Sequence, residues 1–278
     1  MVVMIARRSY NDIGRNIRLE RILRDGKALI FAFDHGVEHG PRDFPEDAID
    51  PRRILSKVAE AGVDAIMTTL GIASMTHEIW GGRVPLIIKL TGKTSMRPEQ
   101  QRLLQSRFGS VEDAVSIGAE AVAATIYWGS EYEDLMLSRW FRIKRIAERL
   151  GIPVLQLAYP RGSAIKSIYD VEVVRYGVRA AIESGADLVK TYYTGSEDSF
   201  RRVVEVASGI PILMSGGAVR ERPSDFLRDV KAAIRAGASG AVVGRNIFQH
   251  RDPVAMIRAL RMIIHEDRDV DDVAKLAE

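Results

Sequence analysis

The ten residues SGADLVKTYY at positions 184–193 contain the unit on which the fold is built. A glycine suited to end a helix in the left-handed conformation precedes a short apolar run, which is typical of a parallel strand covered on both faces. The same unit recurs at AGVDAIMTT (61–69), IGAEAVAATIY (117–127), LGIPVLQLAY (150–159), SGIPILMSGG (208–217) and AGASGAVVGRN (236–246). These repeats predict a series of strand and helix pairs.

Two more apolar runs, at 28–33 and 86–89, raise the number of expected strands to eight. Amphipathic segments separate the runs, so the sequence predicts an α/β fold of the (β/α)8 or TIM barrel type, as a single domain over residues 1–278. A doubly wound open sheet is the alternative, but no G-x-G-x-x-G follows the first expected strand. Residues 1–25 and the charged tail at 266–278 are expected to be peripheral, as a barrel plug, an oligomer contact or frayed ends.

The composition, 46% hydrophobic and 28% charged over 278 residues, is ordinary for a soluble globular protein. No window is apolar enough to span a membrane, and the apolar start of residues 1–12 is too short for a secretory signal, so we expect a cytoplasmic protein without a membrane partner. The absence of cysteine excludes disulfides, thiolate nucleophiles and sulfur-ligated zinc. The formal net charge is only +3, with acidic and basic residues interspersed, which favours solvated helix faces over nucleic-acid binding.

Lys190 is the best single clue to function, because it stands at the end of an apolar strand where an ammonium is poorly solvated. Desolvation lowers the pKa of a lysine, and the neutral amine can attack a carbonyl to form a Schiff base. A snorkelling or ion-paired lysine is the alternative. Lys89 and Lys93 are rivals, although a second cation near Lys190 would also lower its pKa or bind substrate hydroxyls.

Tyr159 and Asp34 also follow expected strands, where the active sites of such barrels lie. Tyr159 precedes Pro160, whose stiff turn would fix the ring for proton transfer; a core tyrosine is the alternative. Asp34 precedes a glycine and suits a carboxylate at the barrel mouth, or simply a turn. Residues 35–39 match H-x-x-E-H, but that zinc motif needs a helix, and glycines bracket the segment, so we expect no metal site.

Two glycine-rich segments predict a phosphate site. Ser215, Gly216 and Gly217 follow the seventh strand and offer unhindered backbone N–H groups. Gly244 and Arg245 follow the eighth strand, where they open a short helix whose N-terminus favours an anion, and Arg245 adds a positive charge. The alternative is that these glycines only form tight turns.

From about Gly14 to His265 the chain resembles the archaeal-type class I fructose-bisphosphate aldolases of the DeoC/FbaB aldolase family. The resemblance rests on FDHGVEHGP (33–41), KLTGKT (89–94), IYWGS (126–130), YPRG (159–162), VKTYYTG (189–195), MSGGA (214–218) and VGRNIFQ (243–249). It implies a Schiff-base aldolase with Lys190 as the iminium-forming residue, Tyr159 as the proton-transfer group and Asp34 as its polar partner. It also implies a homo-oligomer, typically a decamer of two pentameric rings.

The expected reaction is reversible cleavage of fructose 1,6-bisphosphate to dihydroxyacetone phosphate and glyceraldehyde 3-phosphate, as in glycolysis and gluconeogenesis. The iminium would serve as the electron sink, so no cofactor beyond the covalent Schiff base is implied. Sugar phosphates are the expected partners. Their binding residues would be Ser215, Gly216, Gly217, Gly244 and Arg245 for one phosphate, with Arg161, Lys89 and His39 as further substrate-binding residues.

Other assignments remain open from the sequence. The 2-amino-3,7-dideoxy-D-threo-hept-6-ulosonate synthases share the lysine, tyrosine and aspartate, but usually lack Glu38, His39 and Lys93. An autoinducer-2 processing thiolase group lacks the YPRG turn. Leu157 stands where some aldolases of the family have tryptophan, which affects fine substrate contacts. A non-catalytic sugar-phosphate-binding barrel is the alternative outside enzymes, and the acceptor aldehyde is not determined.

Overall fold

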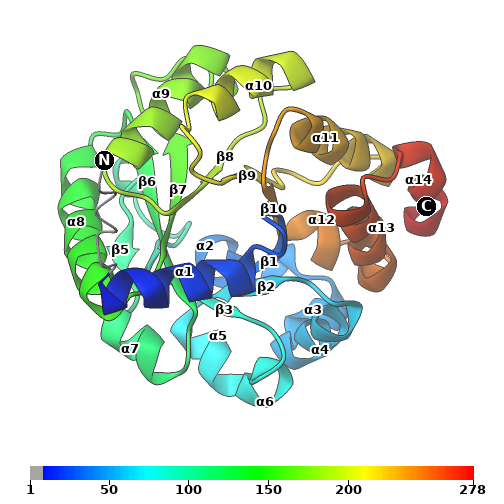
Figure 1. Cartoon of the computed structure of the whole chain (residues 1–278), viewed down its shortest axis with the longest axis horizontal. Coiled ribbons are helices and arrows are strands. Elements are labelled where there is room, and N and C mark those ends of the chain that lie inside the picture. The colour runs from blue at the N-terminus through cyan, green and yellow to red at the C-terminus, as the bar shows by residue number, and fades with distance from the viewer. Residues whose placement is uncertain (1–8) are drawn as a thin grey trace, which may run out of the picture.

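The computed structural model describes residues 9–278, and its centre is a closed barrel of eight parallel strands (Figure 1). Around the barrel the order is β1-β10-β9-β8-β7-β6-β3-β2. The strands are β1 Ala28–Phe33, β2 Ala65–Thr68, β3 Leu86–Lys89, β6 Ala121–Trp128, β7 Val154–Pro160, β8 Leu188–Thr191, β9 Ile212–Ser215 and β10 Gly240–Val243. Because β1 pairs with both β2 and β10, the sheet closes on itself, which excludes the doubly wound alternative. The predicted (β/α)8 barrel is confirmed.

Helices fill the connections and surround the strands (Figure 1). They are α2 His35–His39, α3 Glu46–Ile49, α4 Pro51–Ala61, α5 Leu70–Met75, α6 His77–Trp80, α7 Val111–Ser116, α8 Glu133–Leu150, α9 Val171–Glu183, α10 Glu197–Glu205, α11 Pro223–Arg235, α12 Arg245–Phe248 and α13 Pro253–Glu266. Two 3-10 turns, Pro41–Asp43 and Glu99–Gln101, and a small ribbon of β4 Thr91–Gly92 with β5 Ser106–Arg107 complete the connections. Within residues 9–278 no helix is long and apolar enough to cross a membrane.

The barrel has two apolar layers, which explains the continuously apolar strand sequences. One set of strand residues fills the barrel interior, including Leu155, Leu188 and Leu213. The alternate set, such as Phe31 and Val189, packs outward against the helices. Since side chains alternate between the two faces of a strand, every position of the barrel strands except the half-buried Tyr159 is buried on one face or the other.

The strands differ in length at one side of the barrel. β6 and β7 pair at seven positions, from Val122 with Val154 up to Trp128 with Pro160. The neighbouring pairs β3 with β6 and β7 with β8 are in register over only three positions each. The wall formed by β6 and β7 therefore extends further than its neighbours toward the C-terminal ends of the strands.

The N-terminal helix α1, Tyr10–Ile22, crosses the opposite end of the barrel (Figure 1). Its Ile22 is fully buried in the interior cluster. Arg21 donates to Glu120 just before β6, at 2.8 Å, and Arg18 donates to the Gly151 carbonyl just before β7, at 3.3 Å. Helix α1 thus closes the N-terminal end of the barrel. Of the segment 1–25 expected to be peripheral, residues 1–8 lie outside the described part.

The charged C-terminal segment is also packed. Residues Val270–Ala277 form helix α14, which buries Val270, Val273 and Ala277 and contacts α11 and α13. The ammonium of Lys231 in α11 is buried and donates to the Asp267 and Arg268 carbonyls at 2.5 and 2.9 Å. The many charged residues of this segment obscured the helical spacing of its small apolar residues. The tail lies outside the barrel ring but packs against its helices.

Candidate active site

The strand side chains that point into the barrel are apolar toward the N-terminal ends of the strands and polar at their C-terminal ends. On β8 the inward residues run from Leu188 to Lys190, and on β7 from Leu155 through Leu157 to Tyr159. Leu157 is paired directly with Lys190. Strand alternation therefore delivers the polar residues at the C-terminal ends of the strands into one space.

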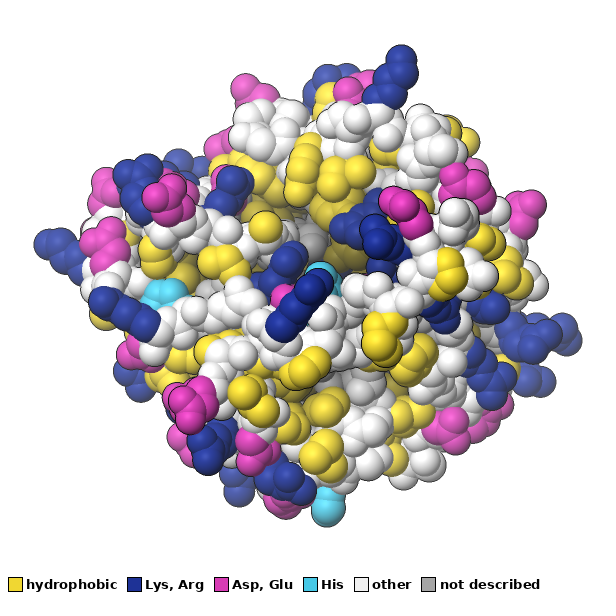
Figure 2. All heavy atoms as spheres, turned by 180° about the vertical axis from the view of Figure 1, so that it is seen from behind, with side chains coloured by type: hydrophobic (Ala, Val, Ile, Leu, Met, Phe, Trp, Pro, Cys, Tyr) yellow, Lys and Arg dark blue, Asp and Glu magenta, His cyan; other side chains and the backbone are white. Residues whose placement is uncertain are grey.

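That space is a cavity of about 250 Å³. Figure 2 shows this face of the molecule, which is hollowed near its centre, with Lys and Arg side chains around the hollow. The cavity brings together every site residue predicted from the sequence: Asp34, His39, Lys89, Tyr159, Arg161, Lys190, Ser215, Gly216, Gly217, Gly244 and Arg245. It also contains residues that the sequence analysis did not assign to the site, among them Ser95, Thr125, Tyr127, Tyr169 and Tyr192.

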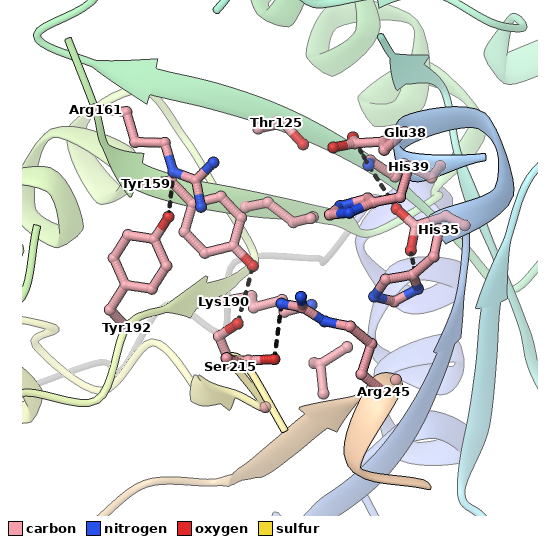
Figure 3. A pocket seen from close by; sticks show the side chains of 18 of the residues that line it. His35, Glu38, His39, Thr125, Tyr159, Arg161, Lys190, Tyr192, Ser215 and Arg245 are labelled. Carbon is pink, nitrogen blue, oxygen red and sulfur yellow. Dashed lines mark hydrogen bonds and ion pairs between the residues drawn. The ribbon is translucent and has the colours of Figure 1, made fainter. Parts of the chain in front are cut away.

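Lys190 is 7% exposed and makes no hydrogen bond or ion pair within residues 9–278. Burial lowers the pKa of its amine to about 8, and the nearby cations Lys89 and Arg245 act in the same direction. Asp34 and Glu38 oppose the shift. Figure 3 shows the side chain among Tyr159, Ser215 and Arg245. A substantial fraction of this amine is neutral near physiological pH, as a carbonyl nucleophile requires.

Lys89 is held differently, although it is equally buried. Its ammonium contacts the Asp34 carboxylate at 2.5 Å and the Glu38 carboxylate at 2.6 Å. Burial opposes the charge, but these two carboxylates raise the pKa of Lys89 above its usual range. Lys89 in turn keeps the pKa of Asp34 low against the effect of burial. Lys89 is therefore a fixed cation, whereas Lys190 is buried with a lowered pKa and no paired carboxylate. The other rival, Lys93, also lines the cavity and has a lowered pKa, but its side chain is only half-buried.

The Tyr159 hydroxyl lies 3.1 Å from the Ser215 hydroxyl, and its ring stacks on Tyr192 with centroids 4.6 Å apart. Burial raises the pKa of Tyr159 to about 12, so the phenol carries its proton at neutral pH. Arg161 donates to the Tyr192 hydroxyl at 2.5 Å and lies 5.4 to 5.7 Å from the ring centres of Tyr127, Tyr159 and Tyr192. This packing fixes both the phenol and a cation at one end of the cavity.

The two glycine-rich loops are tied together opposite Arg161. The Asn246 amide donates to the carbonyls of Gly216 and Ala218 at 2.8 and 3.0 Å, and Arg245 donates to the Gly217 carbonyl at 2.9 Å. Gly217 has φ +65°, which favours glycine. A Cβ at Gly244 would lie 2.3 Å from the His35 ring, so that position has no room for a side chain.

Residues 35–39 form the short helix α2, which corrects the expectation that this segment is not helical. The His35 and His39 rings lie 5.8 Å apart, but the neighbouring carboxylates are engaged by other groups. Glu38 is bound by Lys89, and Asp43 lies 3.2 Å from His39. Within residues 9–278 no cluster of three or more potential metal ligands is present.

The sequence profile of the DeoC/LacD family aldolases matches residues 28–250. The chain belongs to the DeoC/LacD family of aldolases. This aldolase is 42% identical over 244 residues to the class 1 fructose-bisphosphate aldolase of Thermoproteus tenax, covering 87% of this chain and 91% of the relative. It is 36% identical over 255 residues to the enzyme of the same name from Halobacterium salinarum, covering 90% and 95% of the two chains.

Solved structures agree with this membership. A Schiff-base-forming fructose-1,6-bisphosphate aldolase, studied through its reaction intermediates, superposes on this aldolase with a TM-score of 0.85 at 41% identity, over 90% of this chain and 100% of the other. An archaeal fructose-1,6-bisphosphate aldolase, whose catalytic lysine is covalently bound to the carbinolamine intermediate of the substrate, gives 0.84 at 40% identity, over 90% and 99%.

Proposed function

We propose that this aldolase is a class I fructose-1,6-bisphosphate aldolase that uses Lys190 as its Schiff-base lysine. The observation that supports the assignment best is the contrast between the two buried lysines of one cavity. Lys89 is paired with two carboxylates and stays charged, whereas Lys190 lacks such a partner and has a lowered pKa. The relatives named class 1 fructose-bisphosphate aldolase support the choice of substrate.

The reaction begins when the neutral amine of Lys190 attacks carbon 2 of the open-chain sugar. The resulting carbinolamine loses water to give a protonated imine. Tyr159 is the proton donor for the departing hydroxyl, because its phenol is protonated and held toward the cavity by Ser215. The imine is then the electron sink for breaking the bond between carbons 3 and 4.

Cleavage removes the proton from the hydroxyl on carbon 4, and glyceraldehyde 3-phosphate leaves. Asp34 accepts this proton and relays it to Tyr159, which gave up its own proton to the departing hydroxyl, and Lys89 holds the Asp34 carboxylate in place at 2.5 Å. Tyr159 then protonates carbon 3 of the enamine, and water hydrolyses the imine to release dihydroxyacetone phosphate. Tyr159 donates two protons in the cycle and regains two, one from the carbon 4 hydroxyl through Asp34 and one from the water that hydrolyses the imine, so the site returns to its starting protonation state.

The substrate phosphates would bind at opposite ends of the cavity. The loops at Ser215–Gly217 and Gly244–Arg245 would hold the phosphate beside the ketone, using backbone N–H groups and the Arg245 cation. Arg161 would hold the distal phosphate, because its guanidinium is fixed among three tyrosine rings. His39 and Lys89 complete the substrate-binding surface between them.

Borohydride trapping tests the assignment of the lysine. Reduction in the presence of dihydroxyacetone phosphate should leave an adduct on Lys190, located by peptide mass spectrometry. Lys190→Ala should abolish both trapping and cleavage of fructose 1,6-bisphosphate. An adduct on Lys89, or full activity of Lys190→Ala, would falsify the mechanism.

A second assay tests the substrate. Turnover of fructose 1,6-bisphosphate should exceed transfer to aspartate semialdehyde, the acceptor that a heptulosonate synthase would prefer. Binding of sugar phosphates without trapping or cleavage would instead favour a non-catalytic barrel.

We also propose that the enzyme works in the cytoplasm as a homo-oligomer, with a decamer suggested by the family resemblance. Support comes from an apolar stripe on the outer face of α1. Tyr10, Ile13 and Ile17 are 92, 44 and 45% exposed, and their spacing puts them on one side of the helix. An exposed stripe of this kind is typical of a contact surface.

A further inference from the structure

Thr125 carries a buried hydroxyl that the proposed mechanism does not use. Five threonines are buried, namely Thr68, Thr76, Thr91, Thr125 and Thr191. In four of them the hydroxyl oxygen takes part in a hydrogen bond of 2.7 to 3.0 Å. The Thr125 hydroxyl has no hydrogen-bond partner within residues 9–278, although the side chain is only 3% exposed. Buried hydroxyls are nearly always paired, so this one is out of place in a purely structural role.

The position of Thr125 explains where its partner would come from. The residue lines the cavity, and in the view of Figure 3 it lies between Arg161 and Glu38. Its own backbone N–H is already satisfied by the Thr91 hydroxyl at 2.9 Å, which holds the strand in place. The side-chain hydroxyl is thus a fixed polar group on the wall of the cavity.

Strand register relates Thr125 to the reacting lysine. Thr125 of β6 pairs with Leu157 of β7, and Leu157 pairs with Lys190 of β8. Thr125 therefore lies at the level of Lys190 but two strands away, roughly 10 Å along the sheet. The glycine-rich loops follow β9 and β10, on the other side of β8. Thr125 and those loops flank Lys190 from opposite directions.

We propose that Thr125 binds a hydroxyl of the substrate half that leaves as glyceraldehyde 3-phosphate. The inference rests on the proposed function. With one phosphate held at the loops after β9 and β10 and carbon 2 joined to Lys190, the carbons beyond the cleaved bond extend toward β6 and Arg161. An acyclic polyol phosphate offers hydroxyl groups along that path, and the Thr125 oxygen can accept or donate a hydrogen bond to one of them.

Thr125→Val tests the proposal because valine keeps the shape of the side chain and removes only the hydroxyl. The catalytic efficiency kcat/KM for cleavage of fructose 1,6-bisphosphate should fall about tenfold, the effect of one hydrogen bond. Borohydride trapping with dihydroxyacetone phosphate should keep its wild-type rate, because that ligand lacks the glyceraldehyde 3-phosphate half that Thr125 is proposed to bind. Thr125→Ser should restore most of the efficiency.

Thermal stability separates substrate binding from a structural role, because the two roles predict different changes in the Tm of Thr125→Val. Removing an unpaired buried hydroxyl should leave Tm unchanged or raise it. The matched control is Thr68→Val, which removes a hydroxyl that donates to the Phe33 carbonyl at 2.7 Å. That variant should lower Tm and keep wild-type kcat/KM at temperatures where it is folded.

Three results would overturn the proposal: wild-type kcat/KM in Thr125→Val, an equal loss of cleavage and trapping, or a fall in Tm matching that of Thr68→Val. If the wild-type enzyme itself neither cleaves fructose 1,6-bisphosphate nor traps dihydroxyacetone phosphate, the proposed function fails, and with it the basis for the assignment. These two failures are therefore distinguishable.

Discussion

At the scale of single residues, two lysines in one cavity differ in pKa because their surroundings differ. Both are buried, but only Lys89 contacts carboxylates. Desolvation without a counter-charge favours the neutral amine, whereas two carboxylates more than offset desolvation. The same residue type therefore has a lowered pKa on one strand, where we propose it as the nucleophile, and a raised pKa on another.

The lowered pKa of Lys190 predicts the pH dependence of trapping. The reactive form is the neutral amine, and with a pKa of about 8 it makes up roughly a tenth of the enzyme at pH 7 and about half at pH 8. The initial rate of imine formation with dihydroxyacetone phosphate should rise about fivefold between these values and level off above pH 9. A rate that keeps rising tenfold per unit through pH 9 would indicate a lysine with an ordinary pKa.

Lys89→Met removes the cation that helps to hold the pKa of Lys190 down. Asp34 and Glu38, which raise the pKa of Lys190, are then opposed only by burial and Arg245. The midpoint of the trapping profile should move to higher pH by about one unit or more. The control is the unfolding midpoint in urea, since a buried carboxylate that loses its partner costs about 3 to 5 kcal/mol. An unchanged midpoint of trapping would contradict the electrostatic role of Lys89.

At the scale of elements, the loop after β10 packs closely against α2. Gly244 touches this helix: a Cβ there would lie 2.3 Å from the His35 ring and 2.8 Å from the Ala32 carbonyl oxygen. The loop after β10, the short helix and the end of β1 are therefore one packed unit, and a change in one should displace the others.

Gly244→Ala should lower stability by about 1 to 3 kcal/mol, the usual cost of overpacking, and reduce kcat/KM more than tenfold through displacement of the phosphate loop. Gly71→Ala is the matched control. A Cβ at Gly71 in α5 meets nothing within 4 Å, so alanine should stabilise that helix by about 0.5 to 1 kcal/mol. Urea unfolding and steady-state kinetics measure both, and equal stability of the two variants would contradict this packing.

The elements also show how much of the fold can be predicted from the sequence. Glycine followed by an apolar run located the strands, and strand alternation placed Lys190 and Tyr159 in one cavity. Helix α2 was missed because Gly36 lies within it, and its stability comes from distant groups: Lys89 binds Glu38, and Ser95 donates to the Glu38 carbonyl at 2.5 Å. Such contacts follow from the closed barrel and have no local signal.

Thr125 also shows what cannot be predicted from the sequence. Its inward direction could have been read from the alternation of β6, in which Tyr127 also lines the cavity. The lack of a partner for its hydroxyl could not, because that depends on every neighbour in three dimensions. Sequence pattern gives the direction of a side chain, whereas satisfaction of its hydrogen bonds requires the structure.

At the scale of the whole molecule, the two ends of the barrel have different tasks. The N-terminal end is closed by α1, whose inner side inserts Ile22 and whose outer side exposes Tyr10, Ile13 and Ile17. The C-terminal end holds the cavity. A contact between copies through α1 would therefore leave the cavity open.

The double variant Ile13→Glu and Ile17→Glu should dissociate the proposed oligomer, because burying two carboxylates at a contact is unfavourable. Light scattering after size-exclusion chromatography should show a smaller species that keeps the circular dichroism of the barrel. Arg258→Glu, on the exposed face of α13, is a charge-changing control that should leave the mass unchanged. An unaltered assembly in the double variant would place the contact elsewhere.

Because β6 and β7 extend further than the neighbouring strands, the two sides of the cavity should differ in mobility during turnover. Seven paired positions tie the backbone on that side, up to Trp128 and Pro160, whereas β9 and β10 are in register at only two positions before the glycine-rich loops begin. Amide hydrogen exchange should therefore be slow at 124–128 and fast at 217–219. One wall of the cavity has longer strand pairing than the other, so we expect the proposed substrate to enter and leave by movement of the glycine-rich loops while the β6 and β7 side stays still.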